Sequence, residues 1–417
     1  MTETPERWID PERVESAIAA LAEHGARGET GVARLVYSPE WVAAQDQVAA
    51  WMSEGGLRVE RDTVGNVWGY LDGRQGDLPI IATGSHIDSQ NPGGRFDGAL
   101  GVVAGITALA VLRERFGDPE RTLAAVSLVE EEASRFPAAN FWGSRAIIGR
   151  IGTEEPKRLR GYDGVTMVEA MRDAGLDPGL VQDAKRDDID TFIELHIEQG
   201  PFLEHENLPV GIVERITGYR QYLVTLEGAA NHAGTTPMDM RRDPMAGAAE
   251  IISGVIDTAF RMGRPCVTTV GRAIVTPNER AVIPQQVAFT VDARSPLPEQ
   301  RETLLARHEA LMFEVAERRD LKLSLRVDSD RQPVMCDPAL VETIAQAATA
   351  AGVPAMTMTS GAVHDAMQMA EIARIAMVFV RSAGGISHSP DEFTTTEDAA
   401  AGTEVLTRAL HTLAYPS

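Results

Sequence analysis

The chain has 417 residues, of which 44% are hydrophobic and 24% are charged, as in an ordinary globular protein of more than one domain. Its 61 acidic residues outnumber the 39 basic ones, and the net charge of −22 excludes nucleic acid and anionic membrane surfaces as expected partners. No apolar run reaches the ~18 residues of a membrane span, and the N-terminus lacks the apolar segment of a signal peptide. The two cysteines lie outside any C-x-x-C pair, so we expect a reducing, cytoplasmic location.

The first half of the chain alternates apolar, strand-like runs with helical patterns. Strands are predicted over residues 78–84, 122–132 and 191–200. A buried helix that ends at a glycine is predicted over 98–117. Strands separated by helices indicate an α/β sheet with helices on both faces. Ligands of such sheets bind beyond the carboxyl ends of the strands, where four polar side chains lie: His86, Glu131, Glu132 and His196.

The pattern changes after about residue 210 and returns to the first type near Pro338. Between these points the elements follow the order strand–helix–strand–strand–helix–strand, which indicates a ferredoxin-like α+β domain with an antiparallel sheet. One helix is expected to begin at Pro244 with Asp243 as its N-cap. We therefore expect a large α/β domain over 1–212 and 329–417, interrupted by an inserted domain over 213–328.

Five of the nine histidines follow apolar strands in turns rich in glycine, serine or aspartate, namely His86, His196, His232, His364 and His388. The other four, His24, His205, His308 and His411, lie in polar or helical contexts, and we expect them to be exposed. A single histidine in such a turn is more often structural than a metal ligand. The acidic residues beside the first group therefore decide the interpretation.

Asp88 follows His86 closely enough to accept a hydrogen bond from the far nitrogen of its imidazole, which would orient the ring as a metal ligand. Asp97 precedes a predicted helix and is either an N-cap or a ligand. The three carboxylates of Glu130 to Glu132 form either a solvated turn or a site where one binds metal and another acts as a base. Such nitrogen and oxygen ligands, without thiolate, suit zinc, manganese, cobalt or nickel.

Two other site types have little support in the sequence. The segment GGRFDG lacks the Lys-Ser/Thr ending of a phosphate-binding loop and the G-x-G-x-x-G spacing. No G-x-S-x-G motif is present for a serine nucleophile. The glycines around Asp97 would instead let the backbone approach a crowded centre.

The motifs GSHIDS, GGRFDGALGV, EEASRF, ELHIEQGP, NHAGTTPMDMRRDP, SGAVHDA and GGISHSPDEF occur in this order. In them the chain resembles the N-carbamoyl-amino-acid hydrolase and allantoate amidohydrolase group of the di-metal aminoacylase and carboxypeptidase superfamily. The resemblance implies an exopeptidase-like catalytic domain with an inserted lid that also forms a homodimer. It implies two divalent ions per subunit (Mn²⁺, Zn²⁺, Co²⁺ or Ni²⁺), with Asp97 bridging them. The implied ligands are His86, Asp97, Glu132, His196 and His388.

The resemblance also implies roles in catalysis and substrate binding. Glu131 corresponds to the general base, and His232 to a residue that stabilises the oxyanion in the partner subunit's site. Gln199 and Arg294 correspond to substrate contacts, and a bidentate arginine suits a small-molecule carboxylate. The alternative for Arg294 is a surface ion pair with Asp292. His364 is a further candidate substrate contact.

The chain departs from the family pattern in the expected substrate pocket. Ala281 and Gln285 stand where the family's N-V-I-P-G has Asn and Gly, and Val363 replaces a glycine in SGAVHDA. Asn278 or Arg280 is a candidate to replace the lost asparagine contact. None of these changes touches a predicted metal ligand or the base, so they bear on substrate choice.

The leading hypothesis is a metal-dependent amidohydrolase that cleaves a linear C–N bond, the ureido bond of an N-carbamoyl amino acid. The alternative enzyme is an allantoate-type or N-acyl-amino-acid hydrolase with the same site. A catalytically silent metal-binding protein is the non-enzyme alternative, which the presence of Glu131 and all five ligands disfavours.

Overall fold

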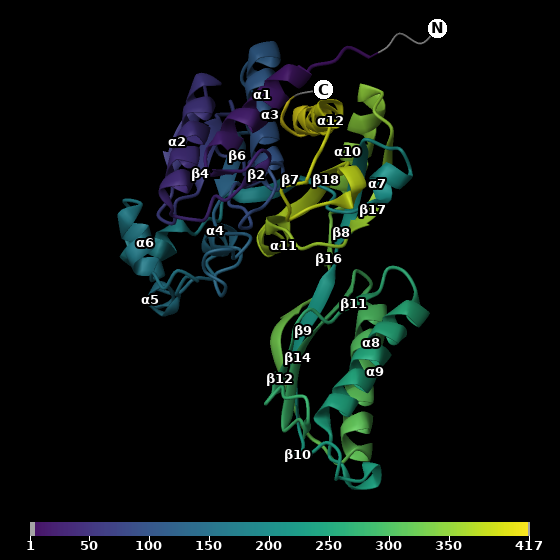
Figure 1. The fold of residues 1–417 in the computed structure, drawn as a ribbon. Helices are drawn as coiled ribbons and strands as arrows, with labels where there is room; N and C mark the ends of the chain where they lie inside the picture. The colour runs from purple at the N-terminus through teal and green to yellow at the C-terminus, as the bar shows by residue number, and fades with distance from the viewer. Residues whose placement is uncertain (1–4, 416–417) are drawn as a thin grey trace. The chain divides into compact units, whose positions relative to one another are not determined.

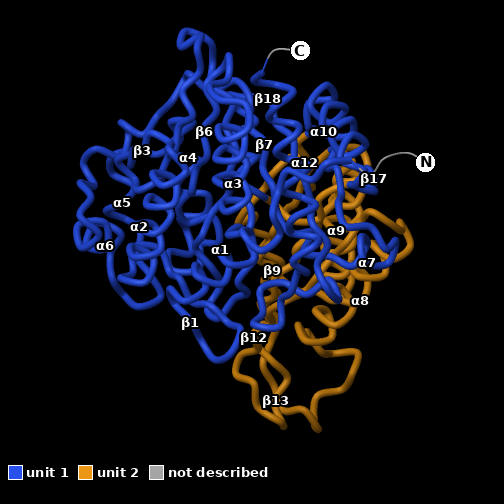
Figure 2. Tube along the Cα trace, turned by 90° about the horizontal axis from the view of Figure 1, so that it is seen from above, with its two compact units in different colours: residues 1–214, 335–358, 364–417 blue, residues 215–334, 359–363 orange. Residues whose placement is uncertain are grey.

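The computed structural model describes residues 5–415, which form two compact units (Figure 2). Unit 1 comprises the described residues before 215, residues 335–358 and the described residues after 363. Unit 2 comprises residues 215–334 and 359–363. The sequence places the inserted domain at 213–328; the second unit extends to residue 334 and takes in a short later segment.

Unit 1 is built on a nine-stranded mixed sheet in the order β16-β8-β18-β7-β5-β6-β4-β3, with β17 paired to β8 (Figure 1). The four central strands β18, β7, β5 and β6 are parallel. Strand β8 pairs antiparallel with β18, β4 pairs antiparallel with β6, and β3 pairs antiparallel with β4. The strands are β3 (Arg58–Arg61), β4 (Val67–Leu71), β5 (Ile80–His86), β6 (Leu123–Leu128), β7 (Ile189–Ile197), β8 (Val210–Ile216), β16 (Val334–Met335), β17 (Ala355–Ser360) and β18 (Arg374–Val380). A separate hairpin joins β1 (Ala26–Arg27) and β2 (Gly31–Val32).

The helices of unit 1 are α1 (Pro11–Glu23), α2 (Pro39–Glu54), α3 (Ala99–Phe116), α4 (Trp142–Ile147), α5 (Glu155–Arg158), α6 (Met167–Asp173), α7 (Phe202–His205), α10 (Pro338–Ala351), α11 (Asp365–Met369) and α12 (Thr396–Ala414). Helix α3 is buried at every position from Ala99 to Leu112, because it packs between the central strands and α12. Strands β5, β6 and β18 are buried along nearly their whole length, as expected for parallel strands covered on both faces. The predicted α/β class is confirmed.

The predicted strand over 122–132 is shorter in the structure. Strand β6 ends at Leu128, and the chain turns through Glu130 and Ala133, which have φ values of 52° and 51°. Three consecutive carboxylates cannot continue into a fully buried sheet without unpaired charge. The turn instead places them beyond the end of the strand.

Unit 2 is an antiparallel sheet in the order β11-β14-β9-β15 with two helices, α8 (Pro244–Met262) and α9 (Pro298–Arg318), packed against it. The strands of this sheet are β9 (Gly218–Glu227), β11 (Val267–Thr269), β12 (Ala273–Thr276), β14 (Gln286–Ser295) and β15 (Lys322–Arg331), and a separate antiparallel pair joins β10 (Asn231–His232) and β13 (Val282–Ile283). Strands β11 and β12 both pair with β14 and act as one interrupted edge strand. The predicted order of strands and helices is confirmed, as is the N-cap, because Asp243 accepts hydrogen bonds from Met245 N and Ala246 N.

The expectation that His308 is exposed is wrong. Its side chain is fully buried on α9, and Nε2 lies 2.9 Å from Thr268 Oγ1. Helical periodicity explains the burial, since Leu304 and Met312, one helical turn away on either side, are buried too.

Candidate active site

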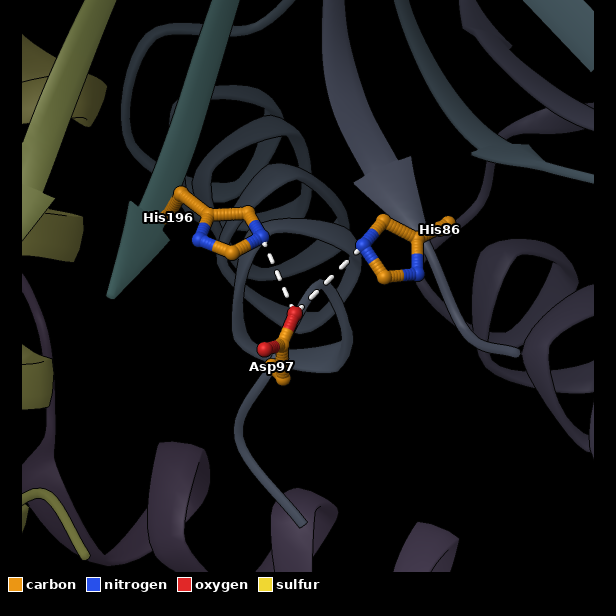
Figure 3. A group of neighbouring side chains, drawn as sticks. All are labelled: His86, Asp97 and His196. Carbon is orange, nitrogen blue, oxygen red and sulfur yellow. Dashed lines mark ion pairs between the residues drawn. The ribbon is translucent and has the colours of Figure 1, made fainter. Parts of the chain in front are cut away.

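Two histidines converge at the carboxyl ends of neighbouring parallel strands. His86 is the last residue of β5, and His196 lies one residue before the end of β7. Asp97 reaches between them from the loop that leads into α3 (Figure 3). Its Oδ1 lies 3.6 Å from His86 Nε2 and 3.3 Å from His196 Nε2. All three side chains are buried, and their ligand atoms are close enough to hold one metal ion.

Asp97 also belongs to a second group of ligands. Its Oδ2 lies 3.5 Å from His388 Nε2, and that nitrogen lies 3.3 Å from Glu132 Oε1. Asp97, Glu132 and His388 form another set whose ligand atoms could hold an ion. One carboxylate therefore faces two adjacent candidate metal positions, one with each oxygen.

The atoms of these two groups fit divalent metal ions. Glu132 Oε1 is buried and has no hydrogen-bond partner among the described residues, which is costly unless a cation satisfies it. Burial raises the pKa of Asp97, but the hydrogen bond and positive charge of His196 and the charges of His86 and His388 hold it below its usual value. The set of imidazole nitrogens and carboxylate oxygens suits zinc, manganese, cobalt or nickel.

Main-chain carbonyls orient both buried imidazoles. His86 Nδ1 lies 3.0 Å from the carbonyl oxygen of Asp88, and His196 Nδ1 lies 3.0 Å from that of Ile197. Each ring thus directs Nε2 into the site. The expected bond from the Asp88 carboxylate to His86 is not the one formed, since that pair is 3.8 Å apart. The carboxylate of Asp88 instead accepts hydrogen bonds from Glu131 N and Glu132 N, and so holds the turn after β6.

Glu131 lies beside the ligands without belonging to either group. Its Oε2 is 3.8 Å from His86 Nε2. Burial and the negative charges of Glu132, Asp365, Asp88 and Asp97 raise the pKa of Glu131 well above its ordinary value. A carboxyl group in this position is suited to accept and return a proton.

Two further candidates lie next to the ligands in unit 1. Gln199 has a φ of 56°, and its Nε2 donates a 2.7 Å hydrogen bond to Asp97 Oδ2. His364 is buried, with its ring centroid 4.7 Å from that of His196. Burial and the charge of His196 lower the pKa of His364 well below its usual value, so its imidazole is neutral.

The remaining three candidates belong to unit 2. His232 Nδ1 accepts hydrogen bonds from Gly234 N (3.1 Å) and Thr235 N (3.2 Å), so its Nε2 carries the proton and is a donor. Arg294 pairs with both carboxylate oxygens of Asp292, at 2.7 and 3.1 Å, which is the ion pair considered from the sequence. Asn278 is exposed, with a φ of 64°.

Sequence reasoning missed three polar side chains that contact the ligands: Gln90, Ser387 and Glu392. Gln90 Nε2 donates a 2.8 Å hydrogen bond to Glu132 Oε2. Glu392 accepts from Asp97 N, and Ser387 Oγ lies 2.8 Å from Asp97 Oδ2. Ser387 and Glu392 lie within GGISHSPDEF, and Gln90 directly follows GSHIDS, which was the available signal, but their partners are distant in sequence.

Glycines permit the close approach of α3 to the site. Gly98 has a φ of 62°, and a Cβ there would lie 2.4 Å from His86 Nε2. A Cβ at Gly101 would lie 2.1 Å from the carbonyl oxygen of Leu195. The expectation that these glycines bring the backbone close to a crowded centre is confirmed.

Histidines and carboxylates gathered at the carboxyl ends of the parallel strands of a mixed α/β sheet suit a metal-dependent hydrolase. The chain matches the model of peptidase family M20/M25/M40 over residues 82–412 and belongs to that family. An allantoate amidohydrolase of Bacillus subtilis is 41% identical over 95% of this chain and 96% of its own length. An N-carbamoyl-L-amino acid amidohydrolase of Geobacillus stearothermophilus is 39% identical over 97% of this chain and 99% of its own length. A hydantoinase/carbamoylase family amidase of Burkholderia multivorans has a TM-score of 0.89 at 35% identity, with 98% of each chain covered.

These comparisons confirm the resemblance drawn from the motifs. The chain is a hydrolase acting on amide or ureido C–N bonds, in a metal-dependent family, and not a catalytically silent protein. Among the described residues, no helix is both long and apolar enough to cross a membrane.

Proposed function

We propose that this hydrolase cleaves the ureido bond of an N-carbamoyl amino acid with the help of two divalent ions (Mn²⁺, Zn²⁺, Co²⁺ or Ni²⁺). The observation that carries the proposal is that two groups of potential ligands share Asp97. His86 and His196 would complete one position, and Glu132 and His388 the other. When bound, such a pair of ions polarises a carbonyl group and lowers the pKa of water.

Glu131 is the base in this proposal. It takes a proton from the attacking water and gives it to the leaving nitrogen. The oxygen of water forms a bond to the ureido carbon, and the bond from that carbon to the amino-acid nitrogen breaks. The products are the amino acid and carbamate, which decays to ammonia and carbon dioxide. The pKa of Glu131, which burial and the charge of Glu132 raise above its ordinary value, supports the role, because a higher pKa makes the carboxylate a better proton acceptor.

The substrate carboxylate is assigned to Arg294, with Asn278, Gln199 and His364 as further contacts. The guanidinium is paired to Asp292 and Nη1 donates a 3.3 Å hydrogen bond to the carbonyl oxygen of Gly361, so it is held in a defined direction, and its remaining N–H groups are the ones assigned to the substrate carboxylate. His232 is assigned to the oxyanion, and its protonated Nε2 supports a donor role. Its partner-site role implies a homodimer formed by the inserted domain.

The helices of unit 2 carry apolar side chains that suit such a dimer. Phe260 is 84% exposed on α8, and Ile256, one helical turn earlier on the same face, is 45% exposed. Light scattering of the full-length protein tests the dimer, and a monomer at micromolar concentration would contradict it.

Allantoate is the second candidate substrate, because the Bacillus subtilis allantoate amidohydrolase is 41% identical to this chain. The test is hydrolysis by metal-loaded protein, measured as ammonia release from N-carbamoyl-α-amino acids, N-carbamoyl-β-alanine and allantoate, and as release of free amino acid from N-acyl amino acids and dipeptides. The N-carbamoyl-α-amino acids should give the highest kcat/KM. Preference for allantoate would replace the leading proposal, and activity that survives exhaustive chelation would refute the metal-dependent mechanism.

A further inference from the structure

Glu392 belongs to neither group of metal ligands, yet it contacts two of the three chain segments that supply the second group, those of Asp97 and His388. It follows His388 in GGISHSPDEF and is only 3% exposed. Its Oε1 accepts hydrogen bonds from the main-chain N–H groups of Phe96 and Asp97, both at 3.0 Å. Its Oε2 accepts a 2.9 Å hydrogen bond from Ser387 Oγ. The side chain therefore ties the loop before α3 to the segment that carries His388.

Ser387 extends this link to the shared ligand. Its Oγ also lies 2.8 Å from Asp97 Oδ2, the oxygen that faces His388. The hydroxyl has one proton, so it donates to one of the two carboxylates at a time. Asp97 is thus held at its main-chain nitrogen by Glu392 and at its side chain by Ser387. These two contacts set the direction in which its carboxylate points.

Gly94 leaves the space that Glu392 occupies. A Cβ at Gly94 would lie 2.2 Å from Oε1 and 2.5 Å from Cβ of Glu392. Because both the head and the base of the side chain are affected, rotating the carboxylate alone would not relieve the overlap. Gly94 is not among the glycines with positive φ, so its backbone conformation does not require a glycine. A glycine is required because any Cβ at this position would overlap the side chain of Glu392.

We propose that Glu392 is a positioning residue that holds Asp97 and His388 in register, so that the second ligand group is assembled before metal arrives. It acts through the ligands and contacts no substrate. The inference rests on the metal site proposed above. Removing a residue that orients a metal ligand typically weakens metal binding by about 10- to 100-fold.

The test is calorimetric titration of the full-length, chelator-treated protein with Mn²⁺, with Co²⁺ visible absorption as a second measure of coordination. Glu392→Ala should bind at least one equivalent of Mn²⁺ with an affinity about 10- to 100-fold lower than that of wild type. Glu392→Gln should bind nearly as tightly as wild type, because its amide oxygen can accept both N–H groups while its amide nitrogen donates to Ser387. Asp391→Ala, at the exposed neighbouring position, is the matched control and should match wild type.

Two further variants test the same contacts by changing the residues next to Glu392, namely Ser387 and Gly94. Ser387→Ala should bind one equivalent of Mn²⁺ more weakly and the other as tightly as wild type. Gly94→Ala should bind Mn²⁺ as weakly as Glu392→Ala does, although it retains the Glu392 carboxylate. If Glu392→Ala fails to fold, these two variants decide by the same criterion.

The outcomes separate this inference from the proposed site. Two Mn²⁺ equivalents in wild type, with unchanged binding in Glu392→Ala, Ser387→Ala and Gly94→Ala, would overturn the inference alone. Binding by Glu392→Gln as weak as that of Glu392→Ala would overturn its hydrogen-bond basis. Fewer than two equivalents in wild type would overturn the proposed site, and the inference with it.

Discussion

Replacing Gly98 with alanine tests how His86 is held. Gly98 combines a φ of 62° with a ψ of −46°, and the added Cβ would lie 2.4 to 2.5 Å from three atoms of the His86 ring. Carbon contacts are normally about 3.5 to 4.0 Å, so the ring or the loop must move by about 1 Å. This sparsely populated backbone conformation costs an alanine about 1–3 kcal/mol in addition.

We expect the displacement of the His86 imidazole to reduce metal binding and turnover more than the lower stability of the variant does. We expect Gly98→Ala to bind Mn²⁺ about 10- to 100-fold more weakly, as when the orientation of a ligand is lost. Turnover should fall by about 100-fold, the usual effect of a 1 Å misplacement. Calorimetric titration with Mn²⁺ and steady-state ammonia release measure the two effects.

Gly28→Ala is the matched control, because Gly28 has a φ of 66° and no atom within 4 Å of the added Cβ. It carries the backbone cost without the contact to His86. Denaturant unfolding should show a loss of about 1–2 kcal/mol in this variant, with metal binding and turnover unchanged. Should Gly98→Ala bind Mn²⁺ and turn over as Gly28→Ala does, the contact does not position His86, and the reasoning fails.

Three other predictions concern separate parts of the molecule. Glu131→Gln should retain Mn²⁺ binding but lose about 10²- to 10⁴-fold in kcat, the contribution of a general base; near-full turnover would remove Glu131 from that role. Arg294→Ala should raise KM for carboxylate substrates with a smaller effect on kcat, and an unchanged KM would place the carboxylate elsewhere. Burial lowers the pKa of His308 from 6.5 to about 4, so the unfolded chain binds the additional proton between these values and stability falls as pH drops through this window. Between pH 7 and 5, wild type should lose about 2 kcal/mol more unfolding free energy than His308→Gln, measured with urea, and equal losses would show that His308 is not buried as a neutral imidazole.

The sequence predicted the main parts of the site because its chemistry is local to strand ends. His86 and His196 each follow an apolar run, and parallel strands bring such residues to one edge of the sheet. Glycines next to Asp97 marked the close approach of the backbone.

What the sequence did not predict depends on contacts between distant segments. The carbonyl oxygen of Asp88, rather than its carboxylate, orients His86, and main-chain atoms leave no trace in residue type. Glu392 appeared as one of many acidic residues, because its partner Asp97 lies far away in the chain. The burial of His308 could have been predicted, since it shares a helix face with Leu304 and Met312, but its polarity suggested exposure.

The packing of α3 against the central strands leaves no room for a methyl group at Gly98 or Gly101. In unit 2, by contrast, Ala281, Gln285 and Asn278 are all exposed. Added side-chain volume is thus excluded at two glycines of the unit that carries the proposed chemistry, whereas Ala281 and Gln285, which depart from the family pattern, and the nearby Asn278 are open to solvent. A library built to change substrate range would do best to randomise those three exposed positions and to keep Gly98 and Gly101 unchanged.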